Sequence, residues 1–218
     1  EKMDRNINDE KSKGSMLSGL IGGTLSLTAS AIIVKLIGLF YKIPMMAYLG
    51  AEGMGYFNSA YEIYSLFFVI ATTGIPVAIS ILVSENKEQG RINNIKKIFK
   101  ISIITLGGIG LIATLLMGVC HKQFATLISN DAASLSILAI SPTVFLVCIS
   151  SAIRGYFQGN QVMIPTAVSQ VIEALGKLIL GLGFAIIAIN NGYSMPIVAA
   201  FAVLGLTVGT LISLLYLV

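Results

Sequence analysis

The chain has 218 residues, of which 56% are hydrophobic and only 11% are charged, and its formal net charge at pH 7 is +4. Average soluble domains carry about 25% charged residues, and the mean hydropathy here is +0.88. The composition therefore excludes a soluble globular protein and predicts an integral membrane protein.

Six apolar runs are long enough to cross a bilayer, which needs about 20 mostly apolar residues. Their limits are 18–48, 56–83, 101–120, 132–153, 162–189 and 196–218, and a polar tail at 1–14 precedes the membrane part at 15–218. The runs lack the alternation and the length of about 10 residues that barrel strands show. We therefore predict an all-α fold, a polytopic membrane bundle of six transmembrane helices.

Lys35 interrupts the first run, and a further apolar stretch follows it, broken only by Lys42 and Pro44. We expect one long bent helix with Lys35 near mid-depth. In the alternative, the span ends at Lys35 and its side chain extends to the interface. A charged group at a helix centre costs about 2.5–3.5 kcal/mol on insertion scales, so such residues normally face a partner or a polar cavity.

The second run carries Glu62 beside an aromatic helix face, and it contains Pro76, as the fourth run contains Pro142. Proline within a helix removes a backbone hydrogen bond, so we expect both spans to bend. The face consists of Phe57, Tyr61, Tyr64 and Phe68. Rings at this spacing indicate packing or an interfacial belt, with sugar stacking as the alternative.

Glu173 and Lys177 lie one helical turn apart in the middle of the fifth run. A glutamate four residues before a lysine favours an ion pair along the helix. The pair either offsets its own desolvation or projects into a hydrophilic cavity that binds a charged headgroup. We expect the second role, with Glu173 holding Lys177.

Loop Lys and Arg residues predict the orientation, because they concentrate on the cytoplasmic side. On one side lie Lys2, Arg5, Lys11, Lys13, Lys87, Arg91, Lys96, Lys97, Lys100 and Arg154, the last at the turn between the fourth and fifth runs; the other side has Lys42 and Lys122. Both termini are therefore predicted to be cytoplasmic. This asymmetry accounts for the net charge, so no nucleic acid is expected as a partner, and membrane lipids are expected at the lysine cluster.

Enzyme, metal and cofactor motifs are absent from the sequence, so we expect neither catalysis nor a cofactor. His121 at the end of the third run is expected to be a solvated loop residue. Cys120 and Cys148 lack metal or redox spacing and are expected to pack. Gly205 and Gly209 form a GxxxG pattern, which is typical of close helix packing in membranes.

Several segments in order resemble the stage V sporulation protein B and polysaccharide exporter family, within the multidrug, oligosaccharidyl-lipid and polysaccharide flippase superfamily that includes lipid II flippases. They are KLIGLFYKIP at 35–44, LGAEGMG at 49–55, YEIY at 61–64, TGIPVAIS at 73–80 and RGYFQGNQVMIPTAVSQVIE at 154–173. The resemblance covers about residues 15–180.

The resemblance implies two lobes around an alternating-access cavity, with this chain as the amino-terminal lobe of a longer protein and a carboxy-terminal lobe as its partner. Lys35 matches a basic residue that meets the lipid-linked pyrophosphate in the family, and Lys177 stands where relatives often have arginine. Relatives carry a second arginine on their first helix, at a position near Lys42 of this chain. They also carry an arginine on their second helix, which has no counterpart among residues 66–70 here.

These features predict a flippase that moves a lipid-linked saccharide across the bacterial cytoplasmic membrane. The expected substrate-binding residues are Lys35, Lys42, Glu62, Arg154, Glu173 and Lys177, with Arg154 at the cytoplasmic mouth. Two alternatives stay open, a drug/cation antiporter of the same superfamily and a membrane scaffold for envelope or spore assembly that transports nothing. The chain opens on Glu1 and stops at Val218 inside an apolar helix, so we expect a fragment.

Overall fold

The computed structural model describes the backbone of residues 2–218 and the side chains of residues 22–70 and 72–218. The described chain is helical throughout, without strands, which confirms the all-α membrane bundle. The predicted polar tail at 1–14, and with it the basic side chains from Lys2 to Lys13, lies outside the described side chains.

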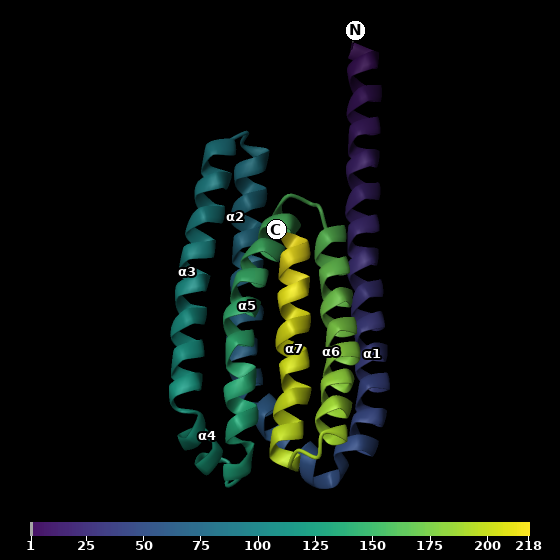
Figure 1. Cartoon of the computed structure of the whole chain (residues 1–218). Coiled ribbons are helices and arrows are strands. Elements are labelled where there is room, and N and C mark those ends of the chain that lie inside the picture. Colours follow the sequence, from purple (N-terminus) through teal and green to yellow (C-terminus); the bar gives the residue numbers. More distant parts are fainter. Residues whose placement is uncertain (1) are drawn as a thin grey trace.

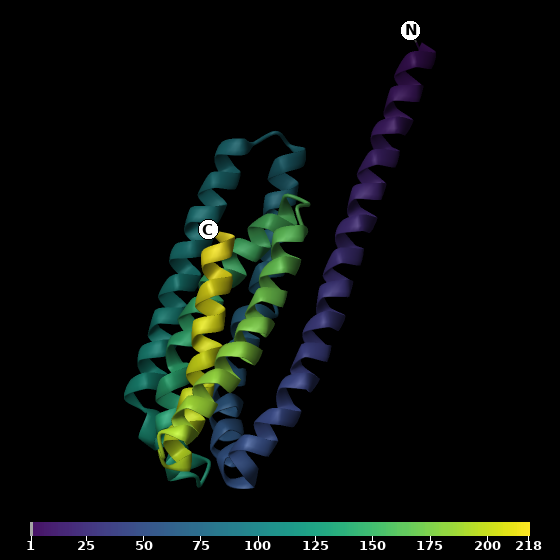
Figure 2. The same ribbon diagram turned by 45° about the vertical axis from the view of Figure 1, so that its right-hand side comes forward.

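The first helix, α1, runs from Lys2 to Thr72 and is broken at Gly50, which has φ 63° and ψ −171°. This backbone region is essentially restricted to glycine. The chain reverses direction there, so that residues before and after Gly50 form two antiparallel arms (Figure 2). Lys35 lies in the first arm, within helix that continues as far as this break.

The second arm does not bend at Pro76 as expected, because α1 ends at Thr72 and a new helix, α2 (Ile75–Glu88), begins with proline in its first turn. Proline is tolerated at this position since the first N–H groups of a helix have no partner inside it. The chain bends between the helices instead. Five stretches of the described chain are long and apolar enough to span a membrane, and the first, Gly22–Glu88, contains both arms and α2.

The remaining helices are α3 (Ile92–Val119), α4 (His121–Leu127), a 3-10 turn η1 (Asp131–Ala133), α5 (Ser134–Gly159), α6 (Ile164–Asn190) and α7 (Met195–Leu217). Helix α5 lies at the centre and contacts α1, α2, α3 and α7 (Figure 1). The short α4 was not expected. It starts at His121, which is half-buried with its Nδ1 2.8 Å from the Gly118 carbonyl oxygen, so the predicted solvated loop histidine is wrong.

Pro142 lacks the N–H that would bond to the Leu138 carbonyl oxygen of α5, and the Ser141 hydroxyl donates to that oxygen instead at 2.9 Å. The Thr114 hydroxyl donates to the Ser141 carbonyl oxygen at 3.0 Å and accepts from the Phe145 N–H at 3.1 Å. Serine and threonine side chains commonly satisfy the backbone groups that a proline frees in a membrane helix, as Ser141 does here. Thr114 therefore joins α3 to α5 beside Pro142.

Glycines bring α6 and α7 into direct backbone contact. A Cβ atom built at Gly205 would lie 2.2 Å from the Gly181 nitrogen, and one at Gly209 would lie 2.9 Å from the Lys177 nitrogen. Only glycine fits this approach, as the GxxxG pattern indicated. The contact fixes the rotation of α6 and thereby the direction in which its polar side chains point.

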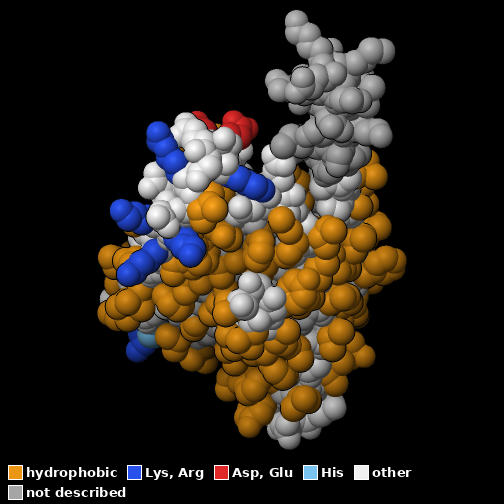
Figure 3. Space-filling view, turned by 90° about the horizontal axis from the view of Figure 1, so that it is seen from above, with side chains coloured by type: hydrophobic (Ala, Val, Ile, Leu, Met, Phe, Trp, Pro, Cys, Tyr) orange, Lys and Arg blue, Asp and Glu red, His pale blue; other side chains and the backbone are white. Residues whose placement is uncertain are grey.

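Basic side chains gather at one end of the bundle, where α2 meets α3 (Figure 3). The α5–α6 turn and the carboxyl end of α7 lie at the same end (Figure 1). Lys87 ties this end together by donating from Nζ to the Asn160 carbonyl oxygen at 2.7 Å. The opposite end carries the Gly50 break and the α6–α7 turn, so the charge asymmetry of the loops coincides with the two ends of the bundle.

Candidate functional site

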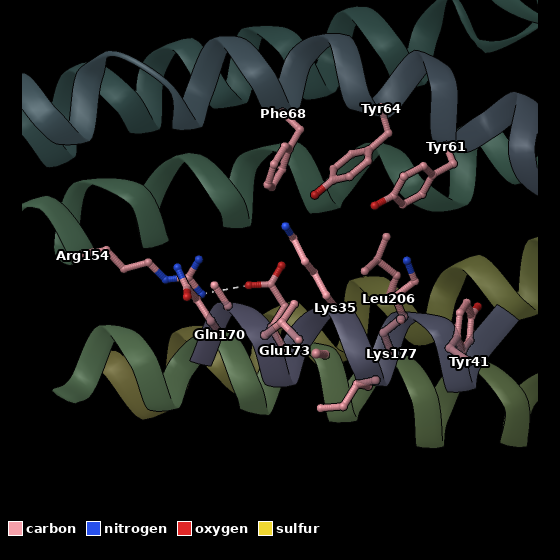
Figure 4. Close-up of a pocket in the computed structure, with 15 residues that line it drawn as sticks. Lys35, Tyr41, Tyr61, Tyr64, Phe68, Arg154, Gln170, Glu173, Lys177 and Leu206 are labelled. Atoms are coloured by element: carbon pink, nitrogen blue, oxygen red, sulfur yellow. Dashed lines mark hydrogen bonds and ion pairs between the residues drawn. The ribbon is translucent and has the colours of Figure 1, made fainter. Parts of the chain in front are cut away.

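A cavity of about 480 Å³ lies between the two arms of α1 and helix α6, and we call it the central cavity. Both arms contribute to it, Arg154 lines it from α5, and Leu206 lines it from α7 (Figure 4). Its size falls within the range of about 300–1,000 Å³ that ligand pockets show. Of the six residues predicted to bind substrate, it brings together Lys35, Arg154, Glu173 and Lys177.

Arg154 and Glu173 form an ion pair across α5 and α6, with the Arg154 Nη2 atom 2.8 Å from Glu173 Oε2. The two side chains are only 12% and 17% exposed. Arg154 also donates to the Ser169 hydroxyl at 3.0 Å and to the Ser213 hydroxyl at 3.2 Å. One guanidinium therefore joins α5, α6 and α7.

This ion pair corrects two sequence-based expectations. Arg154 lies inside α5 and not in the turn after it, because the helix continues to Gly159. Glu173 pairs with Arg154 and not with Lys177, whose salt bridge to Glu173 is not found among the described residues. The Arg154 guanidinium carries several donors in a fixed fork, and it reaches the Glu173 carboxylate and two hydroxyls on neighbouring helices at once.

Lys177 lies against tyrosine rings. Its Nζ atom is 4.4 Å from the centroid of the Tyr61 ring and 5.1 Å from that of Tyr41. A cation within about 6 Å of an aromatic face is attracted by the negative charge of that face, by about 2 kcal/mol when desolvated. The tyrosine rings thus hold Lys177 in the cavity, and it forms no salt bridge among the described residues.

The aromatic face predicted on the second run forms a continuous row of rings along the second arm of α1. Ring centroids are 6.2 Å apart for Phe57 and Tyr61, 5.6 Å for Tyr61 and Tyr64, and 5.6 Å for Tyr64 and Phe68. Phe57 is buried and touches Tyr41. Tyr61, Tyr64 and Phe68 line the central cavity, and we call these three residues the aromatic wall.

Lys35 projects from the first arm towards the aromatic wall (Figure 4). Within the described part of the chain it forms no salt bridge. Lys42 and Glu62 are also on α1, but their side chains are exposed and they do not line the central cavity.

Sequence reasoning missed Gln170 and Tyr41, which line the same cavity. Gln170 accepts from the Ser30 hydroxyl at 3.3 Å and thereby links α6 to the first arm. The spacing of Gln170, Glu173 and Lys177 by three and four residues places them on one helix face, which was the available signal. No cluster of His, Cys, Asp or Glu able to hold a metal occurs among the described residues.

Comparison with known proteins places this arrangement in a family. Residues 20–218 match the family model described as polysaccharide biosynthesis protein. The chain belongs to this family. The match covers every residue that lines the central cavity.

The curated relatives come from Bacillus subtilis (strain 168). The chain is 33% identical to the lipid II flippase MurJ over 205 residues, and 34% identical to the stage V sporulation protein B over 196 residues. Each alignment covers 89% of this chain and 38% of the relative. The chain thus spans less than half the length of these relatives. No solved structure matches it.

Proposed function

We propose that the chain is the amino-terminal lobe of a flippase that moves a lipid-linked saccharide across the bacterial cytoplasmic membrane without covalent chemistry. The observation that supports this most is the central cavity, where Lys35 and Lys177 lack a carboxylate partner among the described residues. Cations are costly within a membrane. A ligand that brings negative charge into the cavity would offset the free-energy cost of placing these cations there.

A lipid-linked diphosphate is the ligand class that fits these cations. Phosphate oxygens accept charge-assisted hydrogen bonds from ammonium groups, and a lysine on a flexible stem can follow a moving ligand. Arg154 contributes less to binding, since Glu173 already neutralises it. In this proposal Lys35 and Lys177 bind the headgroup, while Arg154 and Glu173 keep α5, α6 and α7 in place around it.

The transport cycle would require a second lobe on the open side of the cavity, and the length of the relatives supports its presence. The two lobes would expose the cavity alternately to each face of the membrane. The amino terminus would be cytoplasmic, because Lys96, Lys97 and Lys100 lie in the first turns of α3, at the end of the bundle toward which the amino end of α1 points (Figure 1). The lipid II flippase similarity supports a lipid-linked saccharide as cargo.

The test is complementation of a strain that depends on the full transporter. Lys35→Ala should abolish growth at unchanged membrane abundance, and Lys35→Arg should preserve most of it, because positive charge is the property that matters. Lys42→Ala is the matched control, since Lys42 lies on the same helix but outside the cavity. Full growth with Lys35→Ala would contradict the proposal and favour a scaffold that transports nothing.

A further inference from the structure

The central cavity has two chemically different sides. One side carries Lys35 from the first arm of α1 and Gln170, Glu173 and Lys177 from α6. The other side is the aromatic wall on the second arm (Figure 4). A diphosphate explains the charged side and leaves the aromatic wall without a ligand.

The aromatic wall is unevenly exposed, since the Tyr64 ring is buried with 3% exposure and Phe68 is half-buried. Tyr61 is 37% exposed, although it stacks on Phe57 with an angle of 12° between the rings. The hydroxyl groups of Tyr61 and Tyr64 point into the cavity (Figure 4). Neither hydroxyl has a hydrogen-bond partner among the described side chains, and the amide nitrogen of Gln170 has none either. The wall therefore offers ring surface at Tyr61 and Phe68, together with the hydroxyl groups of Tyr61 and Tyr64.

A sugar ring matches this combination. The C–H bonds on one face of a pyranose carry partial positive charge and are attracted to the negative face of an aromatic ring. Its hydroxyl groups both donate and accept, as do tyrosine hydroxyls, while a side-chain amide nitrogen donates. The ammonium group of Lys177 already occupies such a face at 4.4 Å from the Tyr61 centroid. A sugar ring stacked on Tyr61 would displace this ammonium and free it for the adjoining phosphate.

We propose that the aromatic wall of Tyr61, Tyr64 and Phe68 binds a sugar ring of the cargo and distinguishes a saccharide-bearing lipid from the bare lipid diphosphate. This inference rests on the proposed function. It assigns the two parts of one headgroup to opposite sides of the cavity, the diphosphate to Lys35 and Lys177 and the saccharide to the second arm of α1. Lys177 couples the two parts because sugar binding frees its ammonium group.

The test measures equilibrium binding to the purified full-length transporter with two ligands, a polyprenyl diphosphate with a disaccharide and the same lipid diphosphate without it. The parent protein should bind the saccharide-bearing ligand more tightly. Tyr61→Leu should weaken binding of the saccharide-bearing ligand about tenfold more than binding of the bare lipid diphosphate. Tyr61→Phe should preserve the preference for the saccharide-bearing ligand, because the ring remains. Phe68→Leu provides a second change in the same wall if Tyr61→Leu lowers abundance. Tyr48→Leu is the matched control, an exposed tyrosine of α1 away from the cavity.

The outcomes separate this inference from the proposed function. If the parent binds neither ligand, the proposed function fails and the inference with it. If the parent binds both ligands but Tyr61→Leu and Phe68→Leu leave their ratio unchanged, the proposed function stands and the sugar-binding wall is refuted. An equal loss of affinity for both ligands is one form of this result, and it would mean that the rings only support Lys177.

Discussion

The ion pair between Arg154 and Glu173 should dominate the stability of the lobe around the cavity. The two side chains are 12% and 17% exposed, and their charged atoms are 2.8 Å apart. With an effective dielectric constant of about 20, this separation gives an attraction of about 6 kcal/mol before desolvation. Removal of one partner from a buried pair costs about 3–5 kcal/mol, because the other charge remains buried. Arg154→Met and Glu173→Gln should each destabilise the lobe by about this amount.

The double variant should recover most of the loss. Without Arg154, the hydroxyls of Ser169 and Ser213 still donate, to the carbonyl oxygens of Thr166 and Ser169 respectively. Neither serine hydroxyl is therefore left without an acceptor. Replacement of a whole buried pair by neutral groups is often close to neutral in free energy. We expect a coupling free energy of at least about 2 kcal/mol between Arg154 and Glu173.

Double-mutant cycles measure this coupling. The free energy of unfolding is obtained by titrating the purified full-length transporter with denaturing detergent, with a fluorophore at position 192 reporting on this lobe. A parallel cycle combines Glu173→Gln with Lys177→Met. For this pair we expect a coupling free energy of less than about 1 kcal/mol, because Lys177 contacts tyrosine rings. A larger coupling for Lys177 than for Arg154 would refute the assignment of the pair and restore the pairing along α6.

Three further outcomes follow from the packing and the charge asymmetry. Gly205→Leu should strongly lower membrane abundance, while Gly183→Leu should not, because only the first meets backbone atoms of a neighbouring helix. Thr114→Val should lower the free energy of unfolding by about 1–2 kcal/mol through loss of two hydrogen bonds to α5 beside Pro142, and Thr114→Ser should restore it. A cysteine at position 192 should be labelled by an impermeant reagent in intact cells and one at position 97 should not, and the reverse pattern would contradict the proposed orientation.

Much of the fold was predictable because hydrophobic runs of spanning length determine where helices cross a membrane. The predicted bend within a helix at Pro76 was wrong, because the backbone bends between two separate helices there. Pro76 was expected to bend one helix, but the chain ends a helix before it and starts another, because the first turn of a helix tolerates proline. A sequence pattern places a proline near a bend but does not tell which side of the bend it occupies.

The candidate site was predictable as a set of residues and not as a set of contacts. Lys35, Glu173 and Lys177 were expected in a cavity because charges within apolar runs need a polar environment, and all three line one. The partner of Glu173 was missed, since spacing along a helix reveals neighbours on that helix but not an arginine on another. The position of Arg154 depends on how α5, α6 and α7 pack through their small residues.

Flipping of a labelled lipid-linked disaccharide by the purified full-length transporter in vesicles tests the central claim most directly. The parent and Lys42→Ala should expose the labelled lipid to the opposite leaflet at similar rates, and the double variant Lys35→Ala with Lys177→Met should reduce that rate to the level of vesicles without protein. A double variant that folds and flips the lipid at the parental rate would contradict the claim that these two cations bind the headgroup during transport.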